Sequence, residues 1–191
     1  MTNQTNNINQ TNNINHTNHI NHINQTNHIN QTNHTNHTNH INHINKTAII
    51  TGASRGIGAA IAKKLASCGY NLSLCCRNSS DRLKALADEL HCAYGIEVLC
   101  YTGNVGDFFF AKDMVANTIS HFGHIDVLIN NAGISHIGLL SDMTPEEWNN
   151  IVAINLTGVF NFTKLVIPHM VAEKKGRILQ ISSVWGNVGA S

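Results

Sequence analysis

The sequence lacks the features that mark membrane and secreted proteins. No segment reaches the run of about 18 consecutive apolar residues that a membrane-spanning helix needs. The first residues contain no basic stretch followed by an apolar core, which is the usual form of a secretory signal. From these absences we expect a cytoplasmic protein with no membrane partner.

A large charge of either sign is also lacking. The 12 Lys and Arg residues and the 11 Asp and Glu residues give a formal net charge of +1 at pH 7. Lys46 is the one charged residue before position 47, so the remainder of the chain is neutral overall. A neutral domain produces no long-range field that would attract a polyanion. We therefore expect no nucleic-acid partner.

The five cysteines have neither the paired spacing of a zinc site nor the spacing of a disulfide framework. Cys75, Cys76 and Cys100 lie in apolar runs that are typical of buried strands, and free thiols in a core are typical of a reducing compartment. Neighbouring residues of a strand point to opposite faces, which argues against a redox pair formed by Cys75 and Cys76. We expect no metal site and no disulfide among the cysteines.

Residues 1–46 differ in composition from the rest of the chain. From Thr2 to Lys46 the sequence is a series of fifteen triplets: Thr or Ile, then Asn, then Gln, Asn, His or Lys. A period of three fits neither a strand nor a helix, and the tract has little apolar surface to offset the entropy of ordering. We predict a disordered tract, followed by one domain over 47–191. Loose metal binding by the tract's eight histidines is the alternative function for it.

Residues 47–191 alternate between strand-like and helix-like patterns. Apolar runs typical of strands occur over 47–50, 71–76, 96–101, 125–130 and 176–182, with helical patterns between them. Thr144-Pro145-Glu146-Glu147 is a capping box that opens a long helix, which we expect to run, with a bend, to about Met170. This alternation predicts a doubly wound, Rossmann-like α/β fold with a parallel sheet covered on both faces. Ligands of such folds bind at the carboxyl ends of the strands.

A glycine-rich turn, TGASRGIG, follows the first predicted strand and opens the first helix. Gly52, Gly56 and Gly58 have no Cβ atoms, so the backbone can turn tightly and approach a pyrophosphate. The free N–H groups and the dipole of a helix N-terminus favour the same anion. The sequence therefore predicts dinucleotide binding by this turn. The expected core positions of the helix are Ile57, Ile61, Leu65 and Cys68.

The end of the second predicted strand indicates which dinucleotide binds. Arg77 follows this strand, and no acidic residue occurs before Asp81. An enzyme that prefers NAD places a carboxylate here to bind the ribose 2′-hydroxyl. Arg77, together with Arg55 of the glycine-rich turn, instead suits a 2′-phosphate, because guanidinium groups bind phosphate through paired hydrogen bonds. We predict NADP(H) as the cofactor.

Three further motifs follow in order: NNAG at 130–133, Asn155 in an apolar helical segment, and Ser183 at the end of the fifth predicted strand. Together with the glycine-rich turn, they resemble the short-chain dehydrogenase/reductase family over 47–191. The resemblance implies that Asn155 holds a water of a proton relay and that Ser183 positions a substrate carbonyl. It also implies a cofactor site formed by Gly52, Ser54, Arg55, Gly56, Ile57, Gly58, Arg77, Asn104, Val105, Asn131, Ala132 and Gly133. Many members of the family have Asp where this chain has Asn104.

The resemblance also implies a proton donor that this sequence does not contain. In the family, a tyrosine and a lysine beyond the serine supply the proton, and the family spacing would put both after Ser191. Tyr70, Tyr94 and Tyr101 all lie in the adenosine half of the domain. We therefore interpret the chain as a C-terminally incomplete reductase domain and expect a tyrosine-x3-lysine pattern in the DNA downstream.

Two branches of the family, and one alternative without catalysis, fit the sequence. The domain resembles the 3-oxoacyl-[acyl-carrier-protein] reductases, whose ketone is carried by a protein. The ending SSVWGNVGAS is also similar to the branch that reduces the 5-aminopentanone group of elongation factor P. The alternative is an inactive NADP(H)-binding fragment. Members of the family form homo-oligomers, and we do not expect that assembly of an incomplete domain.

Overall fold

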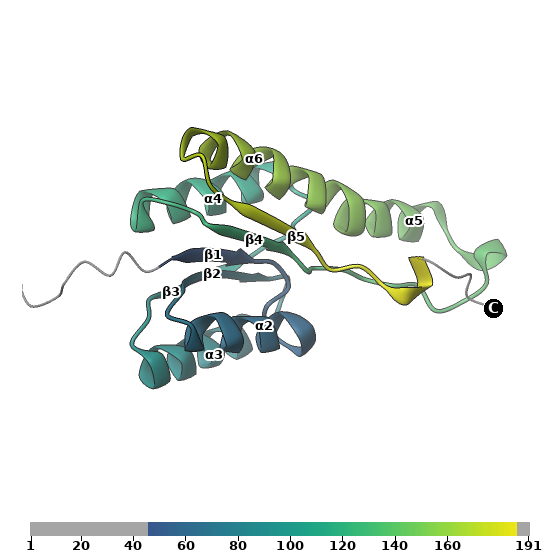
Figure 1. The fold of residues 1–191 in the computed structure, drawn as a ribbon. Coiled ribbons are helices and arrows are strands. Elements are labelled where there is room, and N and C mark those ends of the chain that lie inside the picture. The colour runs from purple at the N-terminus through teal and green to yellow at the C-terminus, as the bar shows by residue number, and fades with distance from the viewer. Residues whose placement is uncertain (1–45, 187–191) are drawn as a thin grey trace, which may run out of the picture. The chain divides into compact units, whose positions relative to one another are not determined.

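The computed structural model describes residues 46–186, which form one parallel sheet with helices on both faces (Figure 1). The predicted disordered tract up to residue 45, and residues 187–191, lie outside the described residues. The strands pair in the order β3-β2-β1-β4-β5, and every pair is parallel. The doubly wound α/β prediction is confirmed. The strands are β1 (Thr47–Ile50), β2 (Asn71–Cys76), β3 (Val98–Thr102), β4 (Val127–Asn130) and β5 (Arg177–Gln180).

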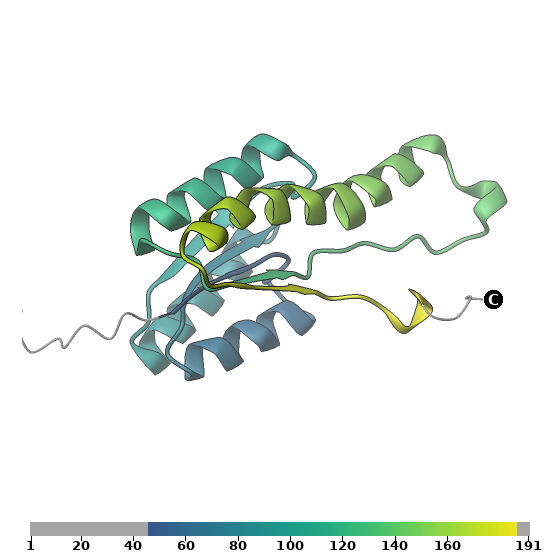
Figure 2. The ribbon, with the colours of Figure 1, turned by 45° about the horizontal axis from the view of Figure 1, so that its top comes forward.

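Helices connect the strands and form a layer on each side of the sheet (Figure 2). One layer contains α2 (Gly56–Ser67) and α3 (Ser80–Tyr94), and the other contains α4 (Phe108–Phe122) and α6 (Gly158–Ala172). Because all strands run in the same direction, their carboxyl ends lie along one edge of the sheet. The shorter elements are η1 (Leu140–Asp142), α5 (Pro145–Val152), the π-helix η2 (Ala153–Thr157) and η3 (Val184–Gly186).

Each face of the sheet has its own hydrophobic core. Ile49 and Ile50 of the central strand β1 are fully buried in different cores, and each such side chain contributes roughly 1.5–3 kcal/mol to stability. Cys76 belongs to the core under α2 and α3, whereas Cys75 belongs to the core under α4 and α6. The two thiols therefore point to opposite faces of the sheet, as predicted.

Three sequence-based expectations about burial are wrong. Cys68 is exposed, because α2 ends at Ser67 and Cys68 is its C-cap rather than a residue of its buried side. Ile57 is 61% exposed, although its position in the helical pattern predicts a core residue. Cys100 is also exposed, because β3 lies at the edge of the sheet and is covered less completely than β1 and β2. Small residues instead bring α2 close to the sheet. The buried residues of α2 are Gly58, Ala62 and Ala66.

The long helix from Pro145 to Ala172 begins at the predicted capping box. The Thr144 hydroxyl accepts a hydrogen bond from the Glu147 backbone N–H at 3.2 Å, and the Glu147 carboxylate accepts one from the Thr144 backbone N–H at 2.9 Å. The backbone N–H of Thr144, and next its hydroxyl, lower the pKa of Glu147. A π-helical turn, η2, interrupts this helix, for which we expected a bend at no particular residue.

This helix is long and apolar enough to cross a membrane by length and composition, with a mean hydropathy of 1.5 in its most apolar window. Core helices of globular domains share that composition. Phe162, Val166 and Met170 are buried against the sheet and α4. These contacts pack one side of α6 onto the sheet and α4, although only 28% of the apolar window is buried.

Asp126 holds together the end of the sheet that lies opposite the carboxyl edge. Its Oδ2 accepts a hydrogen bond from the Thr47 backbone N–H at 2.8 Å, and its Oδ1 lies 3.2 Å from the Lys175 ammonium. His124 Nε2 lies 3.2 Å from Oδ2. The Asp126 side chain is 13% exposed, so water screens these contacts only weakly. We call this group the Asp126 clamp, because it connects the starts of β1, β4 and β5.

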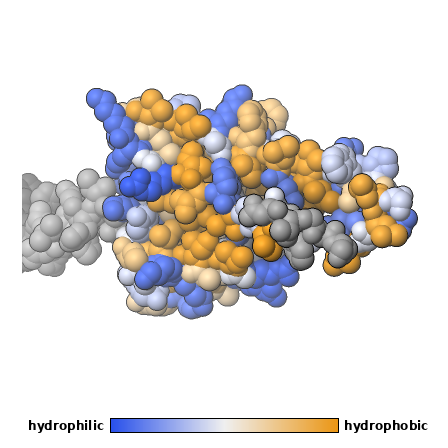
Figure 3. Space-filling view, turned by 45° about the vertical axis from the view of Figure 1, so that its right-hand side comes forward, coloured by the Kyte–Doolittle hydropathy of each residue, from blue (hydrophilic) through white to orange (hydrophobic). Residues whose placement is uncertain are grey.

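One edge of the sheet and part of one helix carry exposed apolar side chains. Within residues 46–186, β5 pairs with β4 alone. Figure 3 shows apolar residues gathered on one face of the molecule. The exposed large apolar residues of β5, of the segment after it and of α6 are Leu179, Ile181, Val184, Phe160, Ile167 and Val171.

Candidate functional site

A cleft of about 750 Å³ opens at the carboxyl ends of β1, β2, β3 and β4. Every residue that the sequence predicts to contact the cofactor lines this cleft, except Gly58, which lies behind the turn. The glycine-rich turn after β1 stands at the middle of the four strands, with Arg77 after β2 on one side and Asn131 after β4 on the other. The strand order therefore brings together motifs that lie as far apart in the sequence as Thr51 and Ala132, which are 81 residues apart.

The glycine-rich turn has the geometry that a close approach of a ligand to the backbone requires. Gly52 and Gly56 have φ angles of +66° and +58°, a conformation that other residues rarely adopt. A Cβ atom at Gly52 would lie 2.8 Å from the Cα of Ala132, whereas nothing lies within 4 Å of a Cβ at Gly56. Gly52 is therefore required for packing, and Gly56 leaves space at the helix start.

The N-terminus of α2 offers unused hydrogen-bond donors. Its N-cap residue, Arg55, makes no side-chain capping bond, and its first turn contains no acidic residue. By contrast, Asp107 caps α4 through the Phe109 backbone N–H at 2.8 Å. The first N–H groups of a helix need acceptors, and a phosphate supplies acceptors together with a charge that the helix dipole favours.

Thr51 connects the turn after β1 to the NNAG segment, and sequence reasoning gave it no role. Its hydroxyl oxygen accepts hydrogen bonds from the backbone N–H groups of Asn131 and Ala132, both at 3.0 Å. The Asn131 side-chain amide in turn donates to the carbonyls of Thr51 and Gly52, at 2.9 and 3.0 Å. The Nδ2 group of Asn131 therefore joins the two loops on either side of the cleft.

The end of β2 forms a wall of the cleft. The Cys75 carbonyl accepts a hydrogen bond from the Ala53 backbone N–H at 2.9 Å, which holds the glycine-rich turn against β2. Burial raises the pKa of the Cys75 thiol to about 12, so the thiol stays protonated at neutral pH. Arg77 and Arg55 are both exposed and line the cleft. Their guanidinium groups can therefore reach a charged ligand there.

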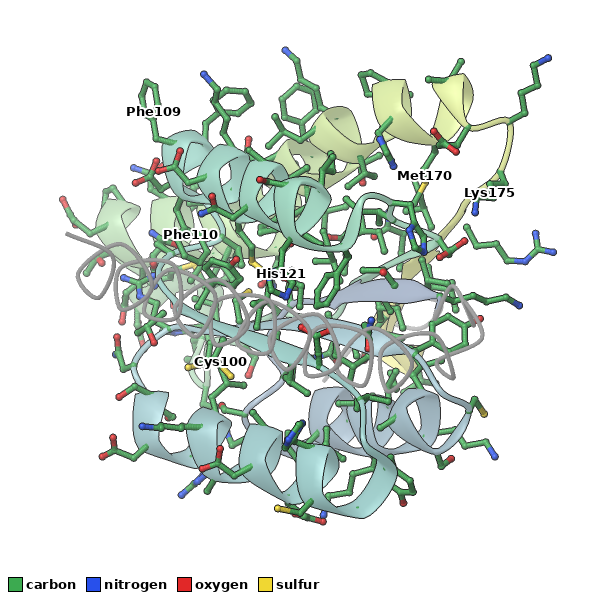
Figure 4. The ribbon with its side chains drawn as sticks, turned by 90° about the vertical axis from the view of Figure 1, so that its left-hand side faces the viewer. Cys100, Phe109, Phe110, His121, Met170 and Lys175 are labelled. Atoms are coloured by element: carbon green, nitrogen blue, oxygen red, sulfur yellow. The ribbon has the colours of Figure 1, made fainter. Side chains whose placement is uncertain are left out.

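The end of β3 forms the outer wall and is held by side chains from two helices. Phe110 of α4 covers Gly103 so closely that a Cβ there would overlap its ring, and it points toward the sheet while Phe109 points away (Figure 4). The buried Asn161 of α6 donates hydrogen bonds to the Val105 and Gly106 carbonyls, at 3.1 and 3.2 Å. Sequence reasoning did not identify Asn161, because an Asn within an apolar helix has no visible partner until the fold brings residue 105 beside it.

Neither of the two predicted catalytic residues lines the cleft. Asn155, in the π-helical turn, uses both ends of its amide on Ile134: Oδ1 accepts from the backbone N–H at 2.9 Å, and Nδ2 donates to the carbonyl at 2.8 Å. Ile134 itself lines the cleft. Ser183 is exposed, three residues beyond β5, and its position at the same carboxyl edge follows from the parallel pairing of β4 and β5. The catalytic roles of both residues stay predictions.

The residues present fit a dinucleotide. A backbone cradle of glycines, an uncapped helix start and two arginines are the groups that bind a pyrophosphate and a further phosphate. None of the three tyrosines lines the cleft in the described part of the chain. Within residues 46–186, no group of three or more His, Cys, Asp or Glu residues is placed to hold a metal ion.

Comparisons with known proteins agree with this geometry. The family model described as short chain dehydrogenase matches residues 46–191. Over 144 residues the chain is 40% identical to the 3-oxoacyl-[acyl-carrier-protein] reductase FabG of Staphylococcus epidermidis, which covers 75% of this chain and 59% of that protein. It is 43% identical over 145 residues to the oxidoreductase UcpA of Salmonella typhimurium, and the match covers 76% of this chain and 54% of that protein. The chain thus spans somewhat more than half the length of these relatives.

Solved structures show the same fold. A metagenomic short-chain oxidoreductase in complex with NADP matches with a TM-score of 0.72 and 35% identity, over 76% of this chain and 66% of that one. An alcohol dehydrogenase from the archaeon Thermococcus sibiricus, complexed with 5-hydroxy-NADP, matches with a TM-score of 0.67 and 36% identity. This match covers 71% of this chain and 57% of that one.

Proposed function

Because the chain belongs to the short-chain dehydrogenase family, we propose that it binds NADP(H) in the cleft and is the cofactor-binding part of a cytoplasmic carbonyl reductase. The observation that carries the proposal is the cleft itself, with its glycine cradle and uncapped helix start between two arginines and the NNAG segment. The cofactor, when bound, supplies a hydride to a ketone.

The chain's own residues have distinct roles in this proposal. The N–H groups at the start of α2 bind the pyrophosphate, and Arg77 and Arg55 bind the 2′-phosphate. Asn131 holds the two central loops together so that the cleft keeps its shape without the ligand. Ser183 positions the ketone carbonyl, and Asn155 keeps the segment at Ile134 in place beside it.

The cofactor preference is tested by measuring dissociation constants for NADPH and NADH with the full chain and with Arg77→Ala. We expect wild type to bind NADPH more tightly than NADH. The substitution should weaken NADPH binding about tenfold, because one charge-assisted phosphate contact is lost, and should leave NADH binding nearly unchanged. Arg82→Ala is the matched control, because Arg82 is exposed on α3 and does not line the cleft. Equal loss for both nucleotides, or no binding of NADPH, would refute the proposal.

The substrate class follows from the relatives. The identity with a 3-oxoacyl-[acyl-carrier-protein] reductase supports a 3-oxoacyl thioester, free or attached to a carrier protein, as the ketone. The 5-aminopentanone group of elongation factor P is the alternative that the segment after Ser183 favours. Oxidation of NADPH with acetoacetyl thioesters, compared with oxidation in the presence of the modified factor, distinguishes the two substrates.

A second candidate function is cofactor binding without catalysis. It is favoured by the positions of Tyr70, Tyr94 and Tyr101, which do not line the cleft and so cannot donate a proton there. General acid catalysis typically contributes a factor of about 10²–10⁴ to a rate. Tight NADPH binding with no NADPH oxidation in a single-turnover assay is the result expected from this function, and measurable turnover would exclude it.

A further inference from the structure

The strand β5 has one unpaired side in the described part of the chain. Within residues 46–186 it pairs with β4 alone. The backbone N–H groups of Arg177 and Ile181 donate to carbonyls on the β4 side, both at 2.9 Å. Successive residues of a strand direct their backbone groups to opposite sides. Ile178 and Gln180 therefore point their N–H and C=O groups away from β4.

This side of β5 also lacks the groups that usually protect an edge strand. Charged residues, prolines and bulges keep such strands from pairing with other chains. From Ile178 to Val184 the sequence ILQISSV contains neither a charge nor a proline. Leu179 and Ile181 of this segment are 44% and 37% exposed. The edge is therefore suited to the addition of another strand.

The helix α6 presents an apolar stripe beside this edge. Thr163 Oγ1 accepts hydrogen bonds from Asn130 of β4 at 3.1 Å and from Gln180 of β5 at 3.5 Å, so α6 lies over the gap between these strands. The helix α4 lies on the opposite flank of α6, toward β2 (Figure 4). The flank of α6 beyond Thr163 is thus the one toward the unpaired side of β5. Its exposed apolar residues are Phe160, Ile167 and Val171.

We propose that a second copy of this chain pairs with β5 in antiparallel orientation, so that the two sheets join and the two α6 helices pack side by side. Neighbouring strands lie about 4.8 Å apart. The gap between β4 and β5 in one copy is then two strand spacings, or about 10 Å, from the same gap in the other copy. Packed helices have axes about 8–10 Å apart. One arrangement therefore satisfies both the strand edge and the apolar stripe.

A two-fold axis at Gln180 gives a register without conflicting charges. Gln180 then lies opposite its own copy, and Ile178 lies opposite the partner's Ser182. Arg177 lies opposite the partner's uncharged Ser183, so like charges do not meet. Because both copies use the same surface, the assembly closes at two. Neither Gln180 nor the α6 stripe lines the cofactor cleft, so the dimer does not depend on the proposed function.

Sedimentation equilibrium of the full chain measures the dissociation constant of the dimer, whose mass is twice the 20.9 kDa of one chain. Gln180→Pro removes the outward N–H group at the centre of the pairing, and proline is tolerated on an edge strand at such a position. Ile167→Lys adds a charge to the α6 contact. Because each change occurs twice at a two-fold interface, each should raise the dissociation constant about tenfold or more. Asn117→Lys is the control, because it adds the same charge to an exposed position of α4, and it should change the constant by less than about threefold.

Oxidative cross-linking tests the register. Gln180→Cys places two thiols at opposite residues of a hydrogen-bonded antiparallel pair, whose Cα atoms are about 5.5 Å apart, and a disulfide spans that distance. Oxidised glutathione is the oxidant, which accepts the two electrons and two protons of the thiols. Ser182→Cys is the control, because its two copies lie several residues out of register. We expect a covalent dimer from Gln180→Cys and none from Ser182→Cys or wild type.

Three results would overturn the inference. The first is a monomer at chain concentrations up to about 100 μM. The second is a dimer that Ile167→Lys does not weaken, and the third is equal cross-linking of the two cysteine variants. Circular dichroism checks that each variant folds, and if Gln180→Pro does not, Ile167→Lys and the cross-linking still decide. NADPH binding is measured separately, so its absence would refute the proposed function and leave the dimer unaffected.

Discussion

Gly58→Ala tests whether the start of α2 is pressed against the loops of the cleft. In a helix, alanine is normally more stable than glycine by up to about 1 kcal/mol, so propensity alone predicts stabilisation. A Cβ at Gly58 would lie 2.5 Å from the Gly52 carbonyl oxygen and 2.6 Å from Asn131 Nδ2, whereas ordinary contacts are 3.4–4 Å. Both neighbours belong to the hydrogen-bonded group that joins the β1 turn to the NNAG segment.

The steric term should outweigh the propensity term. To admit the methyl group, α2 must move off the sheet or the Asn131 amide must lose its bonds to Thr51 and Gly52, each of which contributes about 0.5–1.5 kcal/mol. We expect a net destabilisation of about 1–3 kcal/mol. For a chain of this size, the melting temperature should fall by about 2–4 °C for each kcal/mol.

Denaturant unfolding of the full chain measures this effect, and Gly133→Ala provides the control. A Cβ at Gly133 would meet its nearest neighbour, Asn155 Oδ1, at 3.6 Å, and Gly133 has no positive φ angle. The same chemical change in the same cleft should therefore alter stability by less than about 0.5 kcal/mol. If Gly58→Ala were as stable as wild type, or if both variants lost stability equally, the reasoning from close packing would be refuted.

Two further predictions concern charged groups. Asp126→Asn should destabilise the chain by about 1–3 kcal/mol, measured by urea unfolding, because the mostly buried Asp126 carboxylate loses its charge-assisted hydrogen bonds. Glu89→Gln is the control, because it removes an exposed ion pair with Lys63. In the same titration it should change stability by less than about 1 kcal/mol. Equal effects would contradict the role of burial. Glu147→Gln tests a pH effect: the pKa of Glu147 is lowered from 4.5 in the folded chain, so its contribution is fully present above pH 4.5 and disappears as the pH falls through the folded value. The stability difference between wild type and Glu147→Gln should therefore be constant at neutral pH and shrink in acid, and a difference that does not change with pH would exclude this origin.

Much of the fold follows from local patterns in the sequence. The periods of two and 3.6 residues locate the five strands and their helices, and the capping box at Thr144 marks the start of the long helix to the residue. The expected position of β3 is about two residues early, because Ile96 is buried but precedes the ladder. The prediction that Ile57 is a core residue is wrong for a related reason. Periodicity identifies the apolar positions of a helix, but it does not show which side of the helix packs against the sheet.

The parts of the site that sequence reasoning missed all depend on long-range pairing. Thr51 is an ordinary residue after a strand until β4 pairs with β1 and brings the Asn131 backbone to its hydroxyl. The partner of the buried Asn161 amide becomes evident only when the fold brings the Val105 carbonyl beside it. The glycines and arginines, by contrast, carry their chemistry in their residue type and could be placed from the sequence.

The π-helical turn between α5 and α6 divides one long helix into two parts, and the side chains of one part are rotated about the helix axis relative to those of the other. Such a turn holds one residue more than an α-helix would use for the same advance. Deleting that residue would restore regular winding and rotate all of α5 by about 100° relative to α6. The Asn155 amide would then swing away from Ile134, and the capping box would face a different direction. Because of the extra residue, α6 can stay packed against the sheet while α5 has a different orientation. That orientation is fixed by the two hydrogen bonds between the Asn155 side chain and the Ile134 backbone.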